Sequence, residues 1–368
     1  AEGLGVDFRG ESHRALNDAE TTAAVFVELC NRLLVISNEE RLKLARLVAV
    51  ESAGLATVIA GEKVTTGTVT GMNASFLPEK VNMPPRLEPN DDEAKIDPVV
   101  FKKAFEGSKN VIENFEERPQ QNDMAAIVKK ALETEGRFLI EAGTGVGKSL
   151  AYLLPAALFA IKSGKHVVIS TNTIALQEQL IHKDLPAVQK VLLQEGIIQE
   201  PEEFRSVLLK GRSNYLCTKR WLEHPKVLND SDIGVLAASL AMWLPETKTG
   251  DRAELRLTPT ERTTWNRFCA EGANCLSEHN SFVREGRCFL SRARQEADAA
   301  HVIVVNHALL LADAKSGGNV IPNYDHLILD EVHNLEQQAT QQFGVDIGGR
   351  DIHRVLDLLF RFSSSDQR

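Results

Sequence analysis

Four short runs of the chain are almost wholly apolar. They are 137–142 (RFLIEA), 166–171 (HVVIST), 301–306 (HVIVVN) and 326–331 (HLILDE). Each is rich in Val, Ile and Leu without alternation of apolar and polar positions, which is typical of parallel strands that are covered on both faces. Because segments with helical periodicity separate these runs, we predict an α/β fold with a parallel sheet.

Apolar residues at helical spacing predict helices over 19–36 and 38–60, whereas 61–98 is rich in Thr, Gly, Pro and Asp and is predicted to be a linker. The stretch 206–300 interrupts the α/β rhythm and holds all three Trp, so we predict a mainly helical insertion. The predicted divisions are 1–36, a helical N-terminal segment; 37–96, a helical connector and linker; 97–205, the first part of the α/β domain; 206–300, the insertion; 301–336, the second part of the α/β domain; and 337–368, the start of a further helical insertion.

Composition narrows the class of protein. With 43% hydrophobic residues, the 368-residue chain can bury a core. The net charge of -9 excludes histone-like binding of nucleic acid but leaves room for a local basic groove. The chain contains no apolar run of the roughly 18 to 20 residues that a membrane helix needs and no signal-peptide pattern, so we expect a cytoplasmic protein without a membrane partner.

Residues 137–158 lead from an apolar run through a glycine-rich turn into an apolar helix, which is the context of a phosphate-binding loop. Backbone N–H groups of such a turn surround a polyphosphate, Lys148 supplies a positive charge, and Ser149 offers a hydroxyl to Mg²⁺. A flexible glycine turn alone does not account for the Lys-Ser pair. The predicted nucleotide-binding residues of the loop are Ala142, Gly143, Thr144, Gly145, Val146, Gly147, Lys148 and Ser149.

The apolar run 326–329 ends in two carboxylates, Asp330 and Glu331. At the end of a strand, Asp330 can hold Mg²⁺ through its water shell, and Glu331 can polarise the water that attacks a γ-phosphate. An acidic pair at a helix N-terminus would be the better interpretation of these residues alone. Together with the phosphate-binding loop, they indicate Mg²⁺-ATP hydrolysis.

Four of the five cysteines lie in the predicted insertion. Cys217, Cys269, Cys275 and Cys288 are separated by 51, 5 and 12 residues. An odd number of cysteines does not suit a secreted disulfide framework, and metal binding is favoured. Zinc sites usually contain closely spaced Cys pairs, so the irregular spacing suits an iron–sulfur cluster better, although zinc stays open. Cys30 is expected to be a small buried side chain of an N-terminal helix.

With these motifs, the chain resembles the superfamily 2 helicases. The sequence 330-DEVH-333 is similar to their DEAH box, which implies that His333 couples the ATP site to nucleic-acid binding. Residues 118-RPQQNDMA-125 resemble their Q motif, which implies that Gln121 reads adenine with Arg118 beside it, and Gln120 is the neighbouring alternative. The implied catalytic residues are Lys148, Asp330, Glu331 and His333.

A further segment, 170-STNTIALQEQL-180, resembles the helicase motif that touches the DNA backbone. Hydroxyls at a strand end before a helix can hold phosphates, so we expect Thr171, Thr173 and Gln177 to contact DNA. A helix cap explains either threonine equally well.

A four-cysteine insertion between the phosphate loop and the DEAH-like box is similar to that of the XPD-like iron–sulfur helicases. The segments 210-KGRSNYLC-217, 249-TGDRAEL-255 and 303-IVVNHALLLAD-313 resemble the bacterial DinG branch. The resemblance implies a 4Fe-4S cluster on the four cysteines, 5′-to-3′ DNA unwinding, and ATP and Mg²⁺ as cofactors. The expected partner is single-stranded or forked DNA, and no protein partner is predicted.

Around the last of these cysteines, 284-REGRCFLSRAR-294 carries four arginines. We expect Arg287 and Arg292 to contact DNA phosphates, and Phe282 and Phe289 to offer stacking surfaces. A solvated helix face is the alternative for any single arginine.

Near the N-terminus, His13 and Asp18 have the spacing of the last motif of DnaQ-like DEDDh exonucleases, in which the histidine is the general base and the aspartate a Mg²⁺ ligand. A helix cap with a chance histidine is the alternative. No earlier exonuclease motif precedes residue 12, and nothing after residue 340 resembles a second RecA-like domain. We therefore expect a fragment of an exonuclease–helicase polypeptide that binds ATP and DNA but unwinds little by itself.

Overall fold

The computed structural model describes residues 15–49, 51–64, 76–90, 95–112, 116, 118–134, 136–143, 145–223, 233–271 and 280–344, with single positions at 348, 349 and 356. The chain divides into two compact units. Unit 1 combines 1–83 with 211–293, and unit 2 combines 84–210 with 294–368. No helix in the described ranges has both the length and the apolar character that crossing a membrane requires.

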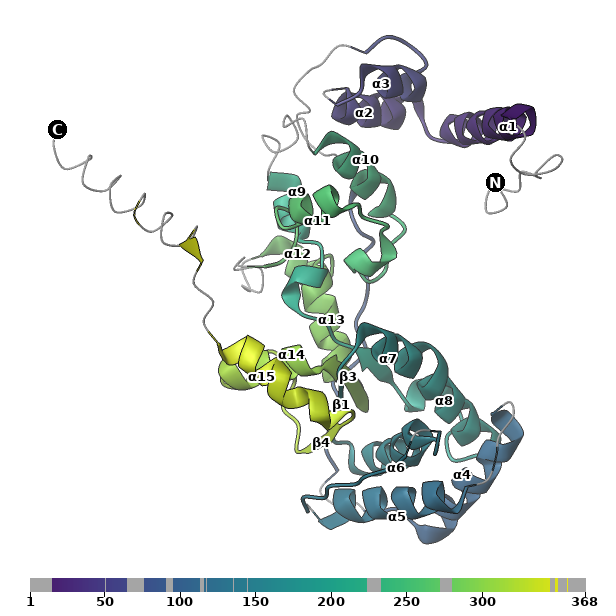
Figure 1. Ribbon diagram of the computed structural model, residues 1–368, viewed down its shortest axis with the longest axis vertical. Helices are drawn as coiled ribbons and strands as arrows, with labels where there is room; N and C mark the ends of the chain where they lie inside the picture. Colours follow the sequence, from purple (N-terminus) through teal and green to yellow (C-terminus); the bar gives the residue numbers. More distant parts are fainter. Residues whose placement is uncertain are drawn as a thin grey trace. The chain divides into compact units, whose positions relative to one another are not determined.

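Unit 2 is built around a four-stranded parallel sheet in the order β2-β3-β1-β4 (Figure 1). Its strands are β1 Val167–Thr171, β2 Ser206–Leu208, β3 Val302–Asn306 and β4 His326–Leu329. Its helical elements are α4 Pro98–Val111, α5 Pro119–Thr134, α6 Lys148–Ser163, α7 Ile174–Gln179, η3 Leu180–Asp184, α8 Leu185–Gln194, η4 Pro201–Glu203, α14 His307–Lys315, η8 Val332–Asn334 and α15 Leu335–Phe343. The α/β fold with a parallel sheet is confirmed.

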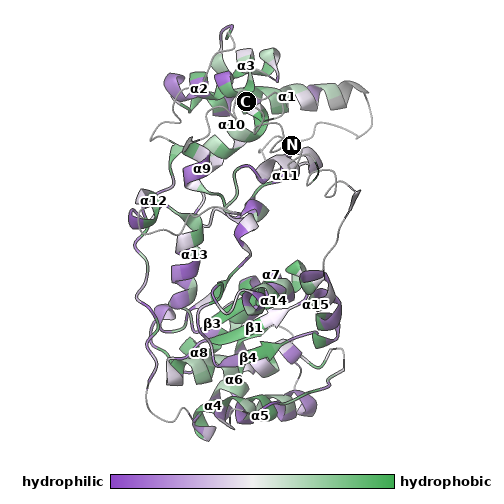
Figure 2. Ribbon diagram, turned by 90° about the vertical axis from the view of Figure 1, so that its left-hand side faces the viewer, coloured by the Kyte–Doolittle hydropathy of each residue, from purple (hydrophilic) through white to green (hydrophobic). Residues whose placement is uncertain are grey.

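The apolar runs explain the sheet. Every residue of β1 is buried, and β3 is buried up to Asn306, as expected for parallel strands with both faces covered. Figure 2 shows β1 in the hydrophobic colour. Helix α6 supplies the largest share of the surrounding core, with Leu153, Leu154 and Phe159 packed against residues of β1 and β3. This burial fixes the N-terminal end of α6 beside the carboxyl ends of the strands.

Two details of the prediction are wrong. The first is the run 137–142, which forms no strand, so that β4 pairs only with β1 among the described strands. An apolar run becomes a strand only where a neighbour completes its hydrogen-bond ladder, and here none does. The second correction concerns 206–208, which was assigned to the insertion but pairs with β3 as β2.

Unit 1 contains the described N-terminal helices and most of the insertion. Its elements are α1 Ala15–Leu34, α2 Asn38–Val48, α3 Ala53–Ala60, η5 Arg212–Asn214, α9 Thr218–Glu223, α10 Gly234–Trp243, η7 Arg252–Glu254, α11 Pro259–Trp265 and α12 Ser281–Arg284, and helix α13 Phe289–Asp298 begins in unit 1 and ends in unit 2. A capping box between Ser37 and Glu40 starts α2. The predicted helix 38–60 is broken where Ser52 caps α3.

The insertion has an aromatic core of its own. Trp221 packs on Phe268 with ring centroids 5.7 Å apart, and Trp243 packs on both Trp265 and Phe289 at 6.4 and 6.5 Å. The indole of Trp265 donates to the carbonyl of Ser213 at 2.7 Å, so the buried polar atom has a partner. These contacts make the insertion a packed body and not a set of loops.

The predicted linker is held at several points. The Leu87 N–H donates to the carbonyl of Asp298 at 2.8 Å, and the Asn90 N–H donates to that of Ser163 at 2.7 Å. Arg86 forms an ion pair with Asp298 at 3.2 Å. Residues 84–90 are therefore an extended strap on unit 2.

Candidate nucleotide-binding site

The glycine-rich turn leads directly into helix α6. Gly145 and Gly147 have φ values of 78° and 80°, a backbone region that side-chain-bearing residues rarely adopt. Gly147 is the N-cap of α6, and no side chain caps the helix there. The first N–H groups of α6 are thus available to an anion, as a phosphate-binding loop requires. Thr144, one of the predicted loop residues, lies outside the described residues.

Of the two neighbouring glutamines, only Gln121 reaches the loop. Its side chain is 5% exposed, and its Nε2 donates to the carbonyl of Gly147 at 2.8 Å. Gln120 is exposed. Arg118 lies next to these residues and forms an ion pair with Glu116 at 2.6 Å. Helix α5 therefore turns Gln121 toward the loop, and the role of Gln121 in reading adenine stays a prediction.

The acidic pair follows β4. The Asp330 N–H donates to the carbonyl of Ser170 at the end of β1 at 2.8 Å, which extends the sheet by one hydrogen bond. Glu331 has φ 55° and ψ 41°, and it is the only non-glycine residue with positive φ in the described part of the chain. This left-handed conformation costs about 1 to 2 kcal/mol. The strained residue lies between the Asp330 carboxylate and the start of η8. Strained residues of this kind are common at functional sites.

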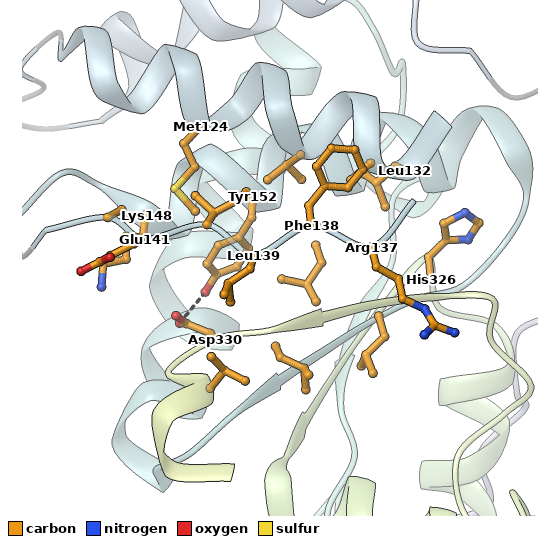
Figure 3. Close-up of a pocket in the computed structure, with 18 of the residues that line it drawn as sticks. Met124, Leu132, Arg137, Phe138, Leu139, Glu141, Lys148, Tyr152, His326 and Asp330 are labelled. Atoms are coloured by element: carbon orange, nitrogen blue, oxygen red, sulfur yellow. Dashed lines mark hydrogen bonds between the residues drawn. The ribbon is translucent and has the colours of Figure 1, made fainter. Parts of the chain in front are cut away.

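The phosphate loop and the acidic pair face each other. Lys148 Nζ lies 3.7 Å from Glu331 Oε1, and the hydroxyl of Tyr152 donates to Asp330 Oδ2 at 3.0 Å. Figure 3 shows Tyr152 and Asp330 pointing toward each other. His333 Nδ1 lies 3.5 Å from Glu331 Oε2 and is mostly exposed. The four predicted catalytic residues are thus brought to one place.

A pocket of about 1180 Å³ opens between α5, residues 136–142 and β4. One end is polar and is lined by Lys148, Asp330 and Glu331. The middle part of the pocket is lined by apolar side chains, among which Leu139 is 88% exposed, and Arg137 and His326 lie at the end opposite Lys148 (Figure 3). The pocket can therefore hold a charged group beside an apolar one, which is the arrangement common to small-molecule sites.

Sequence reasoning missed two side chains of the site. Tyr152 is one turn after Lys148 on α6, and burial followed by the neighbouring Asp330 raises the pKa of its phenol far above the usual value. Asp184 ends the π-helix η3, a rare element that often marks functional sites. Burial raises the pKa of the Asp184 carboxyl, and hydrogen bonds from Gln179 and Ser149 oppose this shift. The helical spacing of Tyr152 from Lys148 could have indicated from the sequence that both face the site. No sequence pattern indicated the π-helix that ends at Asp184.

The predicted DNA-contacting residues of the motif after β1 have different surroundings. Thr173 caps α7 by accepting from the Leu176 N–H at 3.2 Å, which is the alternative considered from the sequence. Thr171 and Gln177 are buried, and Thr171 Oγ1 and Gln177 Nε2 have no hydrogen-bond partner among the described residues. Their contact with DNA stays a prediction.

Beside this motif, Ser170 Oγ lies 2.7 Å from Nδ1 of the buried His307. Burial lowers the pKa of His307, while the backbone of Glu331 and Asp330 raises it. His307 thus lies behind both the acidic pair and the end of β1.

Three of the four predicted metal-binding cysteines lie on neighbouring segments of unit 1. The Cys217 N–H donates to the carbonyl of Phe268 at 2.8 Å, and Leu216 forms a β-bridge with Cys269. Thr218 donates to the carbonyl of Arg287, next to Cys288, at 2.8 Å. Cys217, Cys269 and Cys288 are buried and are not in disulfides, and burial raises the pKa of the latter two.

Nearby, Cys217 also raises the pKa of Cys288, so these two thiols are neighbours. No group of three metal-binding side chains forms a site within the described ranges, and Cys275 lies outside them. Buried thiols on adjacent segments fit a thiolate-bound metal group by their chemistry.

The arginines next to Cys288 differ from the sequence prediction. Arg292 is 3% exposed, and its guanidinium donates to the carbonyls of Gly286 at 2.8 Å and Lys248 at 3.3 Å, and to that of Glu79. Phe289 is fully buried and cannot stack on a base. Arg287 is partly exposed and lies 3.5 Å from Glu285. The structure gives Arg292 a packing role, while a phosphate contact by Arg287 stays a prediction.

Of the two predicted exonuclease residues, His13 lies outside the described residues. Asp18 falls in the first turns of α1, as expected, but its side chain is outside the description.

Comparison with known proteins adds a family to this geometry. Residues 119–203 match the DEAD/DEAH box helicase family. The chain is 35% identical to the ATP-dependent DNA helicase YoaA of Escherichia coli K12 over 264 residues, which cover 69% of this chain and 39% of that protein. It is 37% identical to the ATP-dependent helicase DinG of Mycobacterium tuberculosis H37Rv over 65% of this chain and 39% of that protein.

A longer match joins the chain to a Bacillus subtilis 168 protein named 3'-5' exonuclease DinG. The two are 31% identical over 354 residues, which cover 94% of this chain and 37% of that protein. The chain thus spans less than two fifths of the length of these three relatives.

A phosphate-binding loop that faces an acidic strand end at the edge of a parallel sheet agrees with the match of residues 119–203 to the DEAD/DEAH box helicase family. The likeness to YoaA and DinG proteins is more specific. Over the matched residues, the chain is similar to the DinG-type helicases.

Proposed function

We propose that this chain is the nucleotide-binding part of an ATP-dependent DNA helicase, which hydrolyses Mg²⁺-ATP to move along single-stranded or forked DNA in the 5′-to-3′ direction. The observation that carries the proposal is the approach of Lys148 to Glu331 at 3.7 Å, with Asp330 next to it. In this arrangement Lys148 binds the β- and γ-phosphates, and Glu331 orients the attacking water.

Magnesium would be held by the Ser149 hydroxyl and, through water, by Asp330. Bound there, it neutralises charge on the phosphates. The chain's own residues prepare the site. The two glycines hold the loop open, Lys148 forms an ion pair with Glu331 until phosphate arrives, and Gln121 fixes the last loop carbonyl.

Binding of a fluorescent ATP analogue, measured by anisotropy, tests the first step. We expect Lys148→Ala to weaken binding by at least about tenfold, since it removes a charge-assisted contact of about 1.5 to 3 kcal/mol. Glu331→Gln should keep binding and lose hydrolysis. The matched pair Gln121→Ala and Gln120→Ala separates the buried glutamine from the exposed one, and only the first should weaken binding.

Equal affinity in wild type and Lys148→Ala would exclude the proposed site. Translocation and unwinding are to be measured on the longer polypeptide, with Glu331→Gln as the inactive control.

We also propose that Cys217, Cys269, Cys275 and Cys288 hold a 4Fe-4S cluster. Support comes from three buried cysteines on neighbouring segments, which are joined by a backbone hydrogen bond between Cys217 and Phe268 and by the Thr218 hydroxyl, which donates to the carbonyl of Arg287. Such a cluster cross-links segments far apart in sequence, so it would stiffen unit 1. The chemistry it supplies here is structural, and no catalytic step is assigned to it.

A third proposal concerns residues 1–36, which we assign to the C-terminal end of an exonuclease domain. Support comes from the match to the Bacillus subtilis protein, which covers 94% of this chain. In a longer polypeptide that includes the preceding residues, Asp18→Ala should abolish Mg²⁺-dependent degradation of DNA, and Glu331→Gln should not.

A further inference from the structure

Asp330 is held at both of its carboxylate oxygens. Oδ1 accepts from the Glu331 N–H at 3.0 Å, and Oδ2 accepts from the Tyr152 hydroxyl at 3.0 Å. An ionised carboxylate can accept about four hydrogen bonds, so two acceptor positions stay available for a ligand. With both oxygens anchored, the carboxylate plane cannot rotate freely.

Tyr152 is well suited to fix this carboxylate. The side chain is 2% exposed, lies on α6 and belongs to the core of unit 2. Its ring cannot change rotamer without disturbing close-packed neighbours. The phenol is the donor in its hydrogen bond to Asp330.

The second magnesium-binding side chain expected in the site has a comparable support. Ser149 lies close to the Asp184 carboxyl, since it lowers the pKa that burial of this carboxyl raises. Asp184 is itself fixed by the Gln179 amide, which donates to its Oδ2 at 3.2 Å. Asp184 is the last residue of the π-helix η3.

We propose that Tyr152 and Asp184 are positioning residues for the magnesium ion: Tyr152 orients the Asp330 carboxylate and Asp184 orients the Ser149 hydroxyl, so that both ligands are preset before Mg²⁺-nucleotide binds. The inference rests on the proposed function, because it assumes that the loop binds Mg²⁺-nucleotide. Partners of this kind commonly change metal affinity by about 10- to 100-fold when they are removed.

The test measures binding of a fluorescent ADP analogue to the full chain, first in EDTA and then as Mg²⁺ is titrated. Tyr152→Phe removes one hydroxyl, and Asp184→Asn keeps the shape of the side chain. For each variant we expect the Mg²⁺ concentration at half-saturation to rise about tenfold. Affinity in EDTA should stay within about twofold of wild type, since the loop and Lys148 are untouched.

Tyr324→Phe and Asp298→Asn are the matched controls. Tyr324 is a partly buried tyrosine of unit 2, and Asp298 pairs with Arg86 away from the loop. Both controls should keep the wild-type half-saturation. A general loss of packing would instead weaken binding in EDTA as well, and that result would overturn the positioning role.

Two further outcomes are decisive. If Mg²⁺ half-saturation stays within about twofold of wild type in both variants, the inference is wrong while the proposed function stands. If wild type binds no nucleotide at all, both fail. Should Tyr152→Phe not fold, Asp184→Asn alone decides the question through the same comparison.

Discussion

Replacing Arg292 with leucine distinguishes a packing residue from a DNA-binding one. In the structure, the guanidinium donates to the carbonyls of Gly286, Lys248 and Glu79, which belong to three separate segments of unit 1. It also lies 5.1 Å from the centre of the Phe289 ring. Arg292→Leu removes all of these contacts at once and leaves three part-buried carbonyl oxygens without this donor.

The expected loss follows from these contacts. A fully buried acceptor without a donor costs about 1 to 3 kcal/mol, which is an upper bound for each of these part-buried carbonyls, and the contact with the aromatic ring adds about 0.5 to 1 kcal/mol. Leucine recovers part of the packing of the arginine stem. Since the three carbonyls can relax toward water to different degrees, we expect the free energy of unfolding of unit 1 to fall by about 3 to 5 kcal/mol.

Tryptophan fluorescence during urea unfolding is a suitable assay. All three tryptophans of the chain, Trp221, Trp243 and Trp265, belong to unit 1, so the signal reports on that unit. Arg287→Leu is the control. Its side chain is 21% exposed and pairs with Glu285 at 3.5 Å, and such a pair contributes about 0 to 1 kcal/mol.

Salt dependence of single-stranded DNA binding completes the test. A lost phosphate contact lowers the slope by about 0.7. If Arg292→Leu changes the free energy of unfolding by less than about 1 kcal/mol and lowers this slope, Arg292 contacts DNA and the packing role is refuted.

Three other predictions follow from the structure. Gly147→Ala should lower the free energy of unfolding of unit 2 by about 1 to 2 kcal/mol, because Gly147 has a positive φ and a new Cβ would overlap the Gln121 amide. Calorimetry measures this loss, and Gly143→Ala, which has open space around its Cβ, is the control. Equal losses in both variants would contradict the role of Gln121. Burial, followed by the neighbouring Arg205 and His166, lowers the pKa of His301 to about 4. Below pH about 6.5, His301 therefore binds a proton in the unfolded chain but not in the folded chain. The free energy of unfolding is highest above that pH and falls by up to about 3 kcal/mol toward pH about 4. Circular dichroism melts of wild type and His301→Gln check this, and an unchanged pH slope in the variant would count against it. Anaerobically purified protein should contain iron and absorb light at about 400 nm. Cys217→Ser should reduce the iron content and the absorbance, whereas Cys30→Ser should change neither. Zinc in place of iron would exclude the cluster.

Those parts of the candidate site that depend only on neighbouring residues could be predicted from the sequence. The glycine turn with Lys148 and Ser149 needs only neighbouring residues to define it, and so does an apolar run that ends in Asp330 and Glu331. The structure places both together, because helix α6, which begins at Lys148, packs on the sheet whose strand β4 leads to Asp330 and Glu331. The strained backbone of Glu331 had no sequence signal, since glycine would be the usual residue there.

The sequence by itself determined the class of fold, the phosphate-binding turn and the acidic strand end, because each depends on periodicity or on residues next to one another. Only the tertiary structure decided which of several similar side chains is used. Gln121 and Gln120 differ by one position of a helix, and Arg292 and Arg287 belong to one basic stretch, but long-range partners bury the first of each pair. The apolar run 137–142 illustrates the same limit, because a strand exists only where another segment supplies its hydrogen bonds.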